Sequence, residues 1–129
     1  MRLKIVVVDD NPAVLNQLVS ILERETELEV AATAENGLLA LQSIRQHTPD
    51  VAVVDLGMPV LNGVELTKEL TKMPSHPAVV ICSVENDPEI VKVALQASAL
   101  GYVFKVHMER DLVKAVKLAA QRESFISSF

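Results

Sequence analysis

Five polar side chains that could act on one substrate each follow an apolar run of the chain. They are Asp9, Asp10, Asp55, Ser83 and Lys105. Three carboxylates held close together repel one another, and a hard divalent cation such as Mg²⁺, which prefers oxygen ligands, relieves that repulsion. Such a cation needs few protein ligands and keeps several waters. The three aspartates therefore predict a Mg²⁺ site.

The same set of side chains suits phosphoryl transfer. A carboxylate that keeps one oxygen free of the metal can attack an electrophilic phosphorus atom. The metal and a nearby ammonium group stabilise the charge of a phosphoryl group in transfer, and a hydroxyl can donate a hydrogen bond to it. Asp55 with Lys105 and Ser83 beside it therefore indicates phosphoryl chemistry on an aspartate.

These residues can meet only if the apolar runs are strands of one parallel sheet. The runs are Leu3–Val8, Leu28–Thr33, Val51–Val54, Ala78–Cys82 and Tyr102–Phe104. Nearly continuous apolar character is typical of strands buried on both faces, as in parallel sheets. Sites in open parallel sheets form outside the carboxyl ends of the strands. We therefore expect the five side chains to share one edge of the sheet.

Amphipathic stretches with helical spacing alternate with these strands. The first begins after Asn11, a favourable N-cap, with Pro12 at its first position and Leu18 and Leu22 on one face. Similar spacing predicts further helices near residues 38–44, 64–70, 88–97 and 109–119. The alternation predicts a (βα)5 fold, an α/β doubly wound sandwich with a five-stranded parallel sheet.

Length and composition limit the class of protein. The chain has 129 residues, half of them hydrophobic and 22% charged, which suits one domain with a single core. Its longest apolar runs are strand-sized, so we expect no membrane partner. The net charge of −5 disfavours general binding of nucleic acid by this segment. One unpartnered cysteine, Cys82, fits a reducing compartment and a cytoplasmic location.

We expect a single domain over residues 1–122, followed by a short tail. The tail, residues 123–129, reads ESFISSF. It either completes a helix or begins a linker to an effector domain absent from this chain.

Four motifs in order make the chain resemble the receiver domain of two-component response regulators, over essentially its whole length. They are VVVDDNP at 6–12, VVDLGMPVLNG at 53–63, ICS at 81–83 and ALGYVFK at 99–105. The second is similar to the family's D-x-x-M-P-x-x-N-G block. Within the family, LQASALGYVFKVHMERDLVKAV at 95–116 most resembles receivers of the NarL/FixJ type, which precede a helix-turn-helix DNA-binding domain.

The resemblance implies a flavodoxin-like strand order, 2-1-3-4-5, and a role for each site residue. Asp55 would accept a phosphoryl group from the phosphohistidine of a sensor histidine kinase. Asp9 and Asp10 would hold Mg²⁺, together with Asp55 and the backbone carbonyl of Gly57. Lys105 would pair with the carboxylate of Asp55 and later with the phosphoryl oxygen.

The resemblance also implies a switch and an output. The hydroxyl of Ser83 would turn toward the phosphoryl group, and the ring of Tyr102 would move in behind it. The face made by the fourth helix, fifth strand and fifth helix would then repack and control an output, with homodimerisation on phosphorylation and DNA contact only through an absent effector domain. The family further implies that the protein is not an enzyme, but a phosphoacceptor domain that catalyses its own phosphotransfer and slow dephosphorylation.

Three residues depart from the family pattern. Val106 follows Lys105, where many members have a proline after a cis bond. A cis bond before valine costs roughly 3–4 kcal/mol, so we expect a trans bond and a different position for Lys105. Val84 stands where a smaller alanine is usual, and its bulk should narrow access to the site. Ser98 stands where a glycine often ends the fourth helix.

Three other functions compete with that of a receiver, and the residues disfavour the last two. Val106 leaves room for a receiver-like interaction module with impaired phosphorylation. A phosphatase with an aspartyl-phosphate intermediate would need a general acid two residues after Asp55, where the chain has Gly57. A flavodoxin-like cofactor carrier would need a Ser/Thr/Gly-rich phosphate loop after the first strand, where Asp9 and Asp10 would repel the phosphate.

Overall fold

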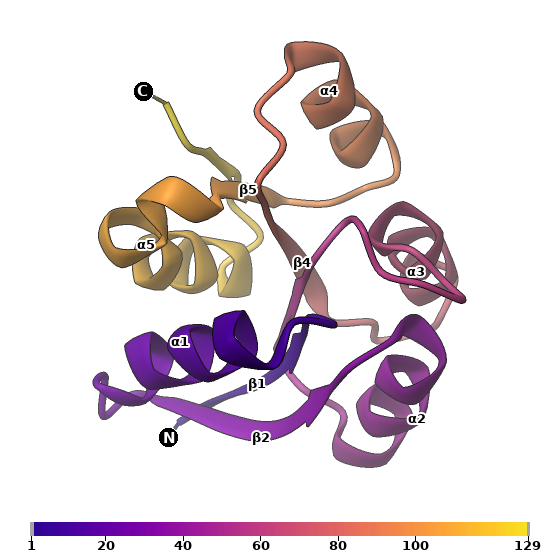
Figure 1. The fold of residues 1–129 in the computed structure, drawn as a ribbon. Helices are drawn as coiled ribbons and strands as arrows, with labels where there is room; N and C mark the ends of the chain where they lie inside the picture. The colour runs from indigo at the N-terminus through magenta and orange to yellow at the C-terminus, as the bar shows by residue number, and fades with distance from the viewer. Residues whose placement is uncertain (1, 129) are drawn as a thin grey trace.

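The fold is a parallel sheet between two layers of helices, seen in a computed structural model that describes residues 2–128 (Figure 1). The elements are β1 (Leu3–Val8), α1 (Pro12–Glu23), β2 (Leu28–Ala34), α2 (Gly37–His47), β3 (Val51–Val54), α3 (Gly63–Thr71), β4 (Ala78–Ser83), α4 (Pro88–Gln96), β5 (Gly101–Phe104), the 3-10 turn η1 (Lys105–His107), α5 (Met108–Ala120) and β6 (Phe125–Ile126). The (βα)5 alternation and the order 2-1-3-4-5 of the first five strands are confirmed.

Each central strand is buried on both faces because its side chains alternate between two cores. In β1, Ile5 and Val7 point into a core that includes α1 and α5 residues, whereas Val6 and Val8 point into a core that includes residues of α2, α3 and α4. Figure 1 shows these two helical layers on opposite sides of the sheet. Such double burial accounts for the nearly continuous apolar runs.

The helices begin where the sequence predicts, but two of them expose one large apolar side chain that helical spacing predicts to be buried. The side chain of Asn11 accepts hydrogen bonds from the backbone N–H groups of Ala13 and Val14, as expected of an N-cap. In α2 the side chain of Leu38 is 54% exposed, and Ala40 is buried. In α4 the side chain of Val93 is 49% exposed, and Val91 is buried. Ile44 of α2 and Ala94 of α4 are buried as predicted, so Leu38 and Val93 are exceptions on otherwise buried faces.

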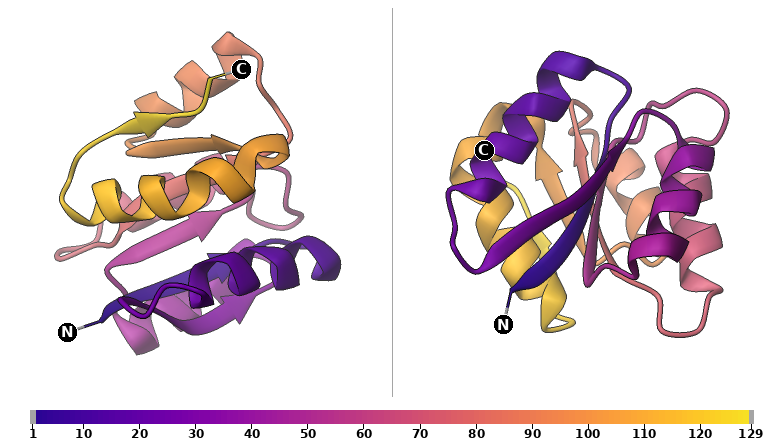
Figure 2. Two further views of the ribbon diagram at one scale, coloured as in Figure 1. Left: turned by 90° about the vertical axis from the view of Figure 1, so that its left-hand side faces the viewer. Right: turned by 90° about the horizontal axis from the view of Figure 1, so that it is seen from below.

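A sixth strand extends the predicted sheet at its β5 edge. β6 pairs in parallel with β5, in the register Gly101↔Phe125 and Tyr102↔Ile126 (Figure 2, left). The tail thus neither completes α5 nor leaves the domain as far as residue 128; Phe129 lies outside the described residues. Pairing covers backbone groups that an edge strand would otherwise present to solvent.

Among residues 2–128, none of the helices is both long enough and apolar enough to cross a bilayer.

Candidate functional site

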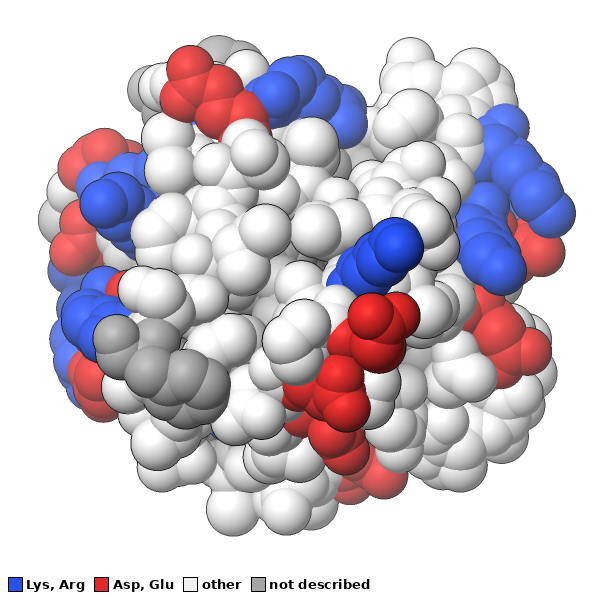
Figure 3. Space-filling model, turned by 90° about the horizontal axis from the view of Figure 1, so that it is seen from above, with Lys and Arg blue, Asp and Glu red and all other residues white. Residues whose placement is uncertain are grey.

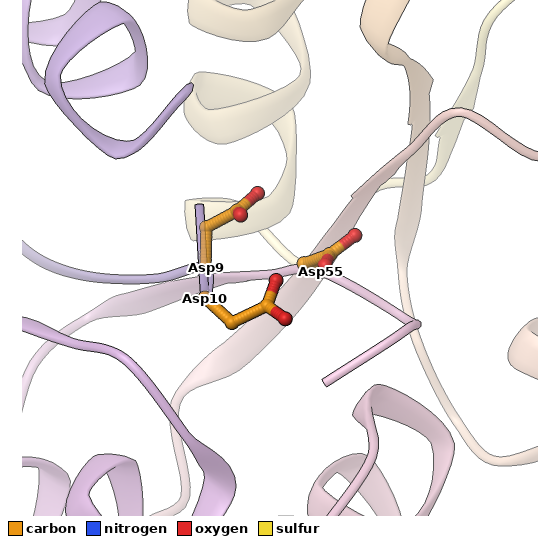
Figure 4. Close-up of side chains that lie close together, drawn as sticks. All are labelled: Asp9, Asp10 and Asp55. Atoms are coloured by element: carbon orange, nitrogen blue, oxygen red, sulfur yellow. The ribbon is translucent and has the colours of Figure 1, made fainter. Parts of the chain in front are cut away.

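Three carboxylates meet at the carboxyl ends of β1 and β3. The two strands pair in register, with Val8 opposite Val54, so Asp9 and Asp55 follow at matching positions. Asp9 and Asp55 are buried, Asp10 is exposed, and one oxygen from each carboxylate lies within 4.8 Å of the others (Figure 4). This donor set fits a hard divalent cation, which needs one or two carboxylates and completes its shell with water.

Lys105 reaches the same point from the end of β5. Its Nζ lies 2.7 Å from Oδ2 of Asp9 and 3.2 Å from Oδ1 of Asp55. The described residues contain no cis peptide bond, so the bond before Val106 is trans, as expected. Lys105 begins the 3-10 turn η1, and the Val106 side chain is 76% exposed. The trans loop therefore still delivers the ammonium group to both buried carboxylates.

The electrostatics of Asp55 and Lys105 follow from burial and from their neighbours. Burial raises the pKa of Asp55, the carboxylate of Asp9 raises it further, and Lys105 offsets these effects only in part. Burial alone would lower the pKa of Lys105, but its contacts with Asp9 and Asp55 outweigh burial and raise that pKa. The lysine thus stays charged, while the crowded Asp55 holds its proton more tightly than a free aspartate.

A cavity of about 420 Å³ opens beside Asp55. It is lined by Asp55, Leu56, Gly57, Asn62, Val64, Ser83, Val84, Glu85, Ile90 and Lys105. Ser83 is buried, and its Oγ accepts a hydrogen bond from the N–H of Glu85 at 3.1 Å. The side chain of Val84 is 74% exposed at this cavity. Of the predicted site residues, Asp55, Gly57, Ser83 and Lys105 therefore share one opening.

Two glycines near Asp55 differ in what they require. A Cβ at Gly57 would meet nothing within 4 Å. A residue with a side chain would therefore fit there and present the same backbone carbonyl. A Cβ at Gly63 would collide with the carbonyl oxygen of Asp55. The preceding Asn62 caps α3 in a capping box with Glu65. The Asn-Gly pair thus allows α3 to start against the strand end that carries Asp55.

Tyr102 is fully buried and its hydroxyl faces the β4–α4 loop. The hydroxyl donates a hydrogen bond to the backbone carbonyl of Glu85 at 2.8 Å, and the ring packs edge-to-face on Phe104 with centroids 6.0 Å apart. Ser83 and Tyr102 are also linked through Glu85, whose N–H donates to Ser83 and whose carbonyl accepts from Tyr102. Sequence reasoning missed Glu85, because a backbone contact leaves no mark on the residue type.

The chain is similar in sequence to known proteins over almost its whole length. The chain is 35% identical over 126 residues to the transcriptional regulatory protein DegU of Brevibacillus brevis, covering 97% of this chain and 53% of DegU. It is 31% identical over 116 residues to the chemotaxis protein CheY of Halobacterium salinarum, covering 90% of this chain and 95% of CheY. The chain thus spans about half the length of the first of these relatives and nearly all of the second.

The fold is similar to that of solved receiver domains. The signal receiver domain of NarL from Mycobacterium tuberculosis superposes with a TM-score of 0.86 at 32% identity, covering 93% of this chain and 97% of that one. The predicted resemblance to receivers of the NarL type is therefore confirmed.

The expectation that the protein is not an enzyme has to be corrected. The chain is 30% identical over 130 residues to a protein-glutamate methylesterase/protein-glutamine glutaminase of Sulfurimonas denitrificans, covering 93% of this chain and 37% of that protein. That relative is named as an enzyme, and part of its chain is similar to this receiver-like chain. Similarity to receivers therefore does not exclude an enzyme.

Residues 5–117 match the model of the response regulator receiver domain. This match covers all of the strand ends that carry the aspartates, the serine and the lysine. The chain therefore belongs to the family of response regulator receiver domains.

Proposed function

We propose that this receiver domain accepts a phosphoryl group on Asp55 from the phosphohistidine of a sensor histidine kinase. An Oδ atom of Asp55 forms the new bond to phosphorus, and the bond from phosphorus to the histidine nitrogen breaks. The observation that carries the proposal is the position of Asp55, which lines an open cavity while Lys105 lies 3.2 Å from its carboxylate.

Asp9, Asp10, Asp55 and the backbone carbonyl of Gly57 are proposed to hold Mg²⁺. When bound, the ion would neutralise carboxylates and stabilise charge on the phosphoryl group. Lys105 contributes a second positive charge on the side of Asp9. The hydroxyl of Ser83, which lines the same cavity, is positioned to donate a hydrogen bond to a phosphoryl oxygen.

Ser83 and Tyr102 are proposed to pass the phosphorylation state to the face made by α4, β5 and α5. Glu85 supports this proposal because its N–H bonds to Ser83 and its carbonyl accepts from Tyr102. A ligand can shift such an equilibrium only by its different affinity for the two states. A hydrogen bond from Ser83 to a charged phosphoryl group, worth about 1.5–3 kcal/mol, supplies such a difference.

The output is proposed to be control of transcription through a DNA-binding domain outside this chain, with homodimerisation on phosphorylation. Support comes from DegU, a transcriptional regulatory protein of which the chain covers 53%. We also place the protein in the cytoplasm, because a single free cysteine, Cys82, fits a reducing compartment.

The alternative of an interaction module with impaired phosphorylation relied on Val106. The reach of Lys105 to both carboxylates through the trans loop argues against it. The phosphatase alternative is disfavoured because Gly57 offers only backbone at the position of the required acid.

Labelling of Asp55 tests the proposal. Acetyl phosphate or phosphoramidate with Mg²⁺ should add one labile phosphoryl group, seen by intact-protein mass spectrometry. Asp55→Asn should abolish the added mass. Asp87→Asn is the matched control, because Asp87 is exposed and asparagine also caps a helix. A phosphoryl group that persists on the Asp55→Asn protein would refute Asp55 as the acceptor.

A further inference from the structure

The outer edge of β5 is covered by the chain's own C-terminal segment, residues 124–128. The N–H of Phe125 donates to the carbonyl of Leu100 at 3.2 Å, and the N–H of Ser127 donates to the carbonyl of Tyr102 at 2.8 Å. The N–H of Phe104 in turn donates to Oγ of Ser127 at 3.1 Å. Three successive hydrogen bonds therefore join the segment to residues 100–104.

Ser127 is the anchor of this segment. Its side chain is buried, and its Oγ donates a hydrogen bond to Oδ2 of Asp111 on α5 at 2.7 Å. Arg110 holds both oxygens of Asp111, at 2.8 and 2.9 Å, and also donates to the carbonyl of Ser128 at 2.6 Å. A buried carboxylate is stable only when it is paired and hydrogen-bonded. Asp111 and Arg110 thus form a recognition site for a serine and the carbonyl that follows it.

The segment is held by few contacts. β6 has only two residues, and Ile126 is 47% exposed. The bonds from Phe125, Ser127 and Arg110 must offset the entropy lost on ordering the whole segment. A strand this short at a sheet edge is an element that can open without unfolding the domain.

Tyr102 connects this edge to the candidate site. Its backbone carbonyl accepts from Ser127, and its hydroxyl donates to Glu85, whose N–H bonds Ser83 in the cavity beside Asp55. Ile126 lies opposite Tyr102 in the strand register and so faces the same side of the sheet. The docked segment therefore covers β5, the strand that carries the buried ring of Tyr102. The hydroxyl of that ring contacts Glu85 beside the candidate site.

The segment also completes a surface. Ile126 and Phe104 line a groove of about 570 Å³ together with residues of α4, among them Val91 and Leu95. Figure 3 shows, from above, an uncharged stretch of surface with charged side chains mainly around it. Release of the segment would remove Ile126 from the lining of this groove.

We propose that the β5 edge and Asp111 form a docking site for the chain's own residues 124–128, and that docking of this segment is coupled to burial of Tyr102. Because coupling is reciprocal, whatever stabilises the buried ring strengthens docking, and docking strengthens the buried ring. The link to phosphorylation rests on the function proposed for Asp55, whereas the docking site itself does not.

The emission of Tyr102 provides a direct test, since the chain has one tyrosine and no tryptophan. Collisional quenching by acrylamide should be weak in the parent protein. It should increase in Ser127→Ala and in Asp111→Ala, which break the anchor from either side. Ser128→Ala, the matched control at an exposed side chain, should quench like the parent. Unchanged quenching in both anchor variants, with circular dichroism showing folded protein, would overturn the proposal.

Hydrogen exchange on the unmodified protein covers the case in which the variants do not fold. The amides of Ser127 and Phe104 should exchange faster than the amide of Ile81 in β4, through local opening of the edge. Exchange of all three only on global unfolding would contradict a displaceable segment.

Beryllofluoride with Mg²⁺ tests the coupling. It should slow exchange at Ser127 and Phe104 in the parent protein and leave Asp55→Asn unaffected. Stronger acrylamide quenching in the anchor variants, without any labelling of Asp55, would support the docking site and contradict the phosphoacceptor function. Labelling of Asp55 with no change in exchange at Ser127 would contradict the coupling alone.

Discussion

Lys105 lies between two buried carboxylates and is nearer to Asp9 than to Asp55, at 2.7 Å against 3.2 Å. Its side chain is 13% exposed, and that of Asp9 is fully buried. The closer pairing with Asp9 leaves Asp55 less compensated, in keeping with the raised pKa of Asp55. The lysine thus stabilises the site as a whole and leaves the proposed acceptor beside an open cavity.

Removal of the Lys105 charge should destabilise the fold. Lys105→Met leaves Asp9 buried without its partner, and breaking a buried ion pair costs about 3 kcal/mol. Urea denaturation should show this loss in the free energy of unfolding. Lys72→Met, which removes an exposed ion pair with Glu69, should change the same quantity by less than about 0.5 kcal/mol. Equal effects of the two substitutions would contradict a structural role for the Lys105 pair.

The raised pKa of Asp55 should make the contribution of Asp55 to stability fall as pH rises. Between the usual aspartate value of 3.8 and the higher folded value, the folded protein binds more protons at Asp55 than the unfolded chain does. The slope of the free energy of unfolding against pH is negative wherever the folded state holds more protons. Asp55→Asn removes this contribution. As pH rises through that window, the free energy of unfolding of the variant should therefore increase relative to that of the parent. A constant difference across the window would show that Asp55 titrates normally.

Mg²⁺ should stabilise the parent protein in the absence of any phosphoryl donor. A ligand present at 100 times its dissociation constant adds about 2.7 kcal/mol to the free energy of unfolding. Thermal melts with Mg²⁺ and with EDTA measure the effect. Asp10→Asn should reduce it, because Asp10 is one of the three carboxylates within 4.8 Å. Asp87→Asn, at the exposed cap of α4, should retain it. A Mg²⁺ effect that survives in Asp10→Asn would place the ion elsewhere.

The carboxylate cluster could be predicted from the sequence because strand ends in a parallel sheet share one edge. Asp9, Asp55 and Lys105 needed only the order of the strands to be brought together. The trans bond was expected, but the reach of Lys105 to both carboxylates could not be predicted, since it depends on the turn η1 after β5.

The tail and the loop contacts lay beyond sequence reasoning for a different reason. β6 has two residues, too few for any periodic pattern, and its pairing depends on β5 some twenty residues earlier. The role of Glu85 uses backbone atoms alone. In α2, Ala40 packs inward in place of the larger Leu38, because the position of the helix on the sheet, and not hydrophobicity, selects the buried face.

Replacement of Ser98 by glycine should stabilise the domain. Ser98 follows the C-cap of α4 with φ of 83°, in the left-handed region, where a side chain costs roughly 1–2 kcal/mol. The N–H of Ser98 donates to the carbonyl of Leu95, and the N–H of Ala99 donates to the carbonyl of Ala94. These two hydrogen bonds form a Schellman motif, which favours glycine at the position of Ser98. Ser98→Gly should therefore raise the free energy of unfolding by about 1 kcal/mol. Ser20→Gly, at an exposed position inside α1, should lower it by about 0.5 kcal/mol, because glycine disfavours a helix interior. A fall in the free energy of unfolding of Ser98→Gly, measured by urea denaturation, would show that the conformation of Ser98 is not strained.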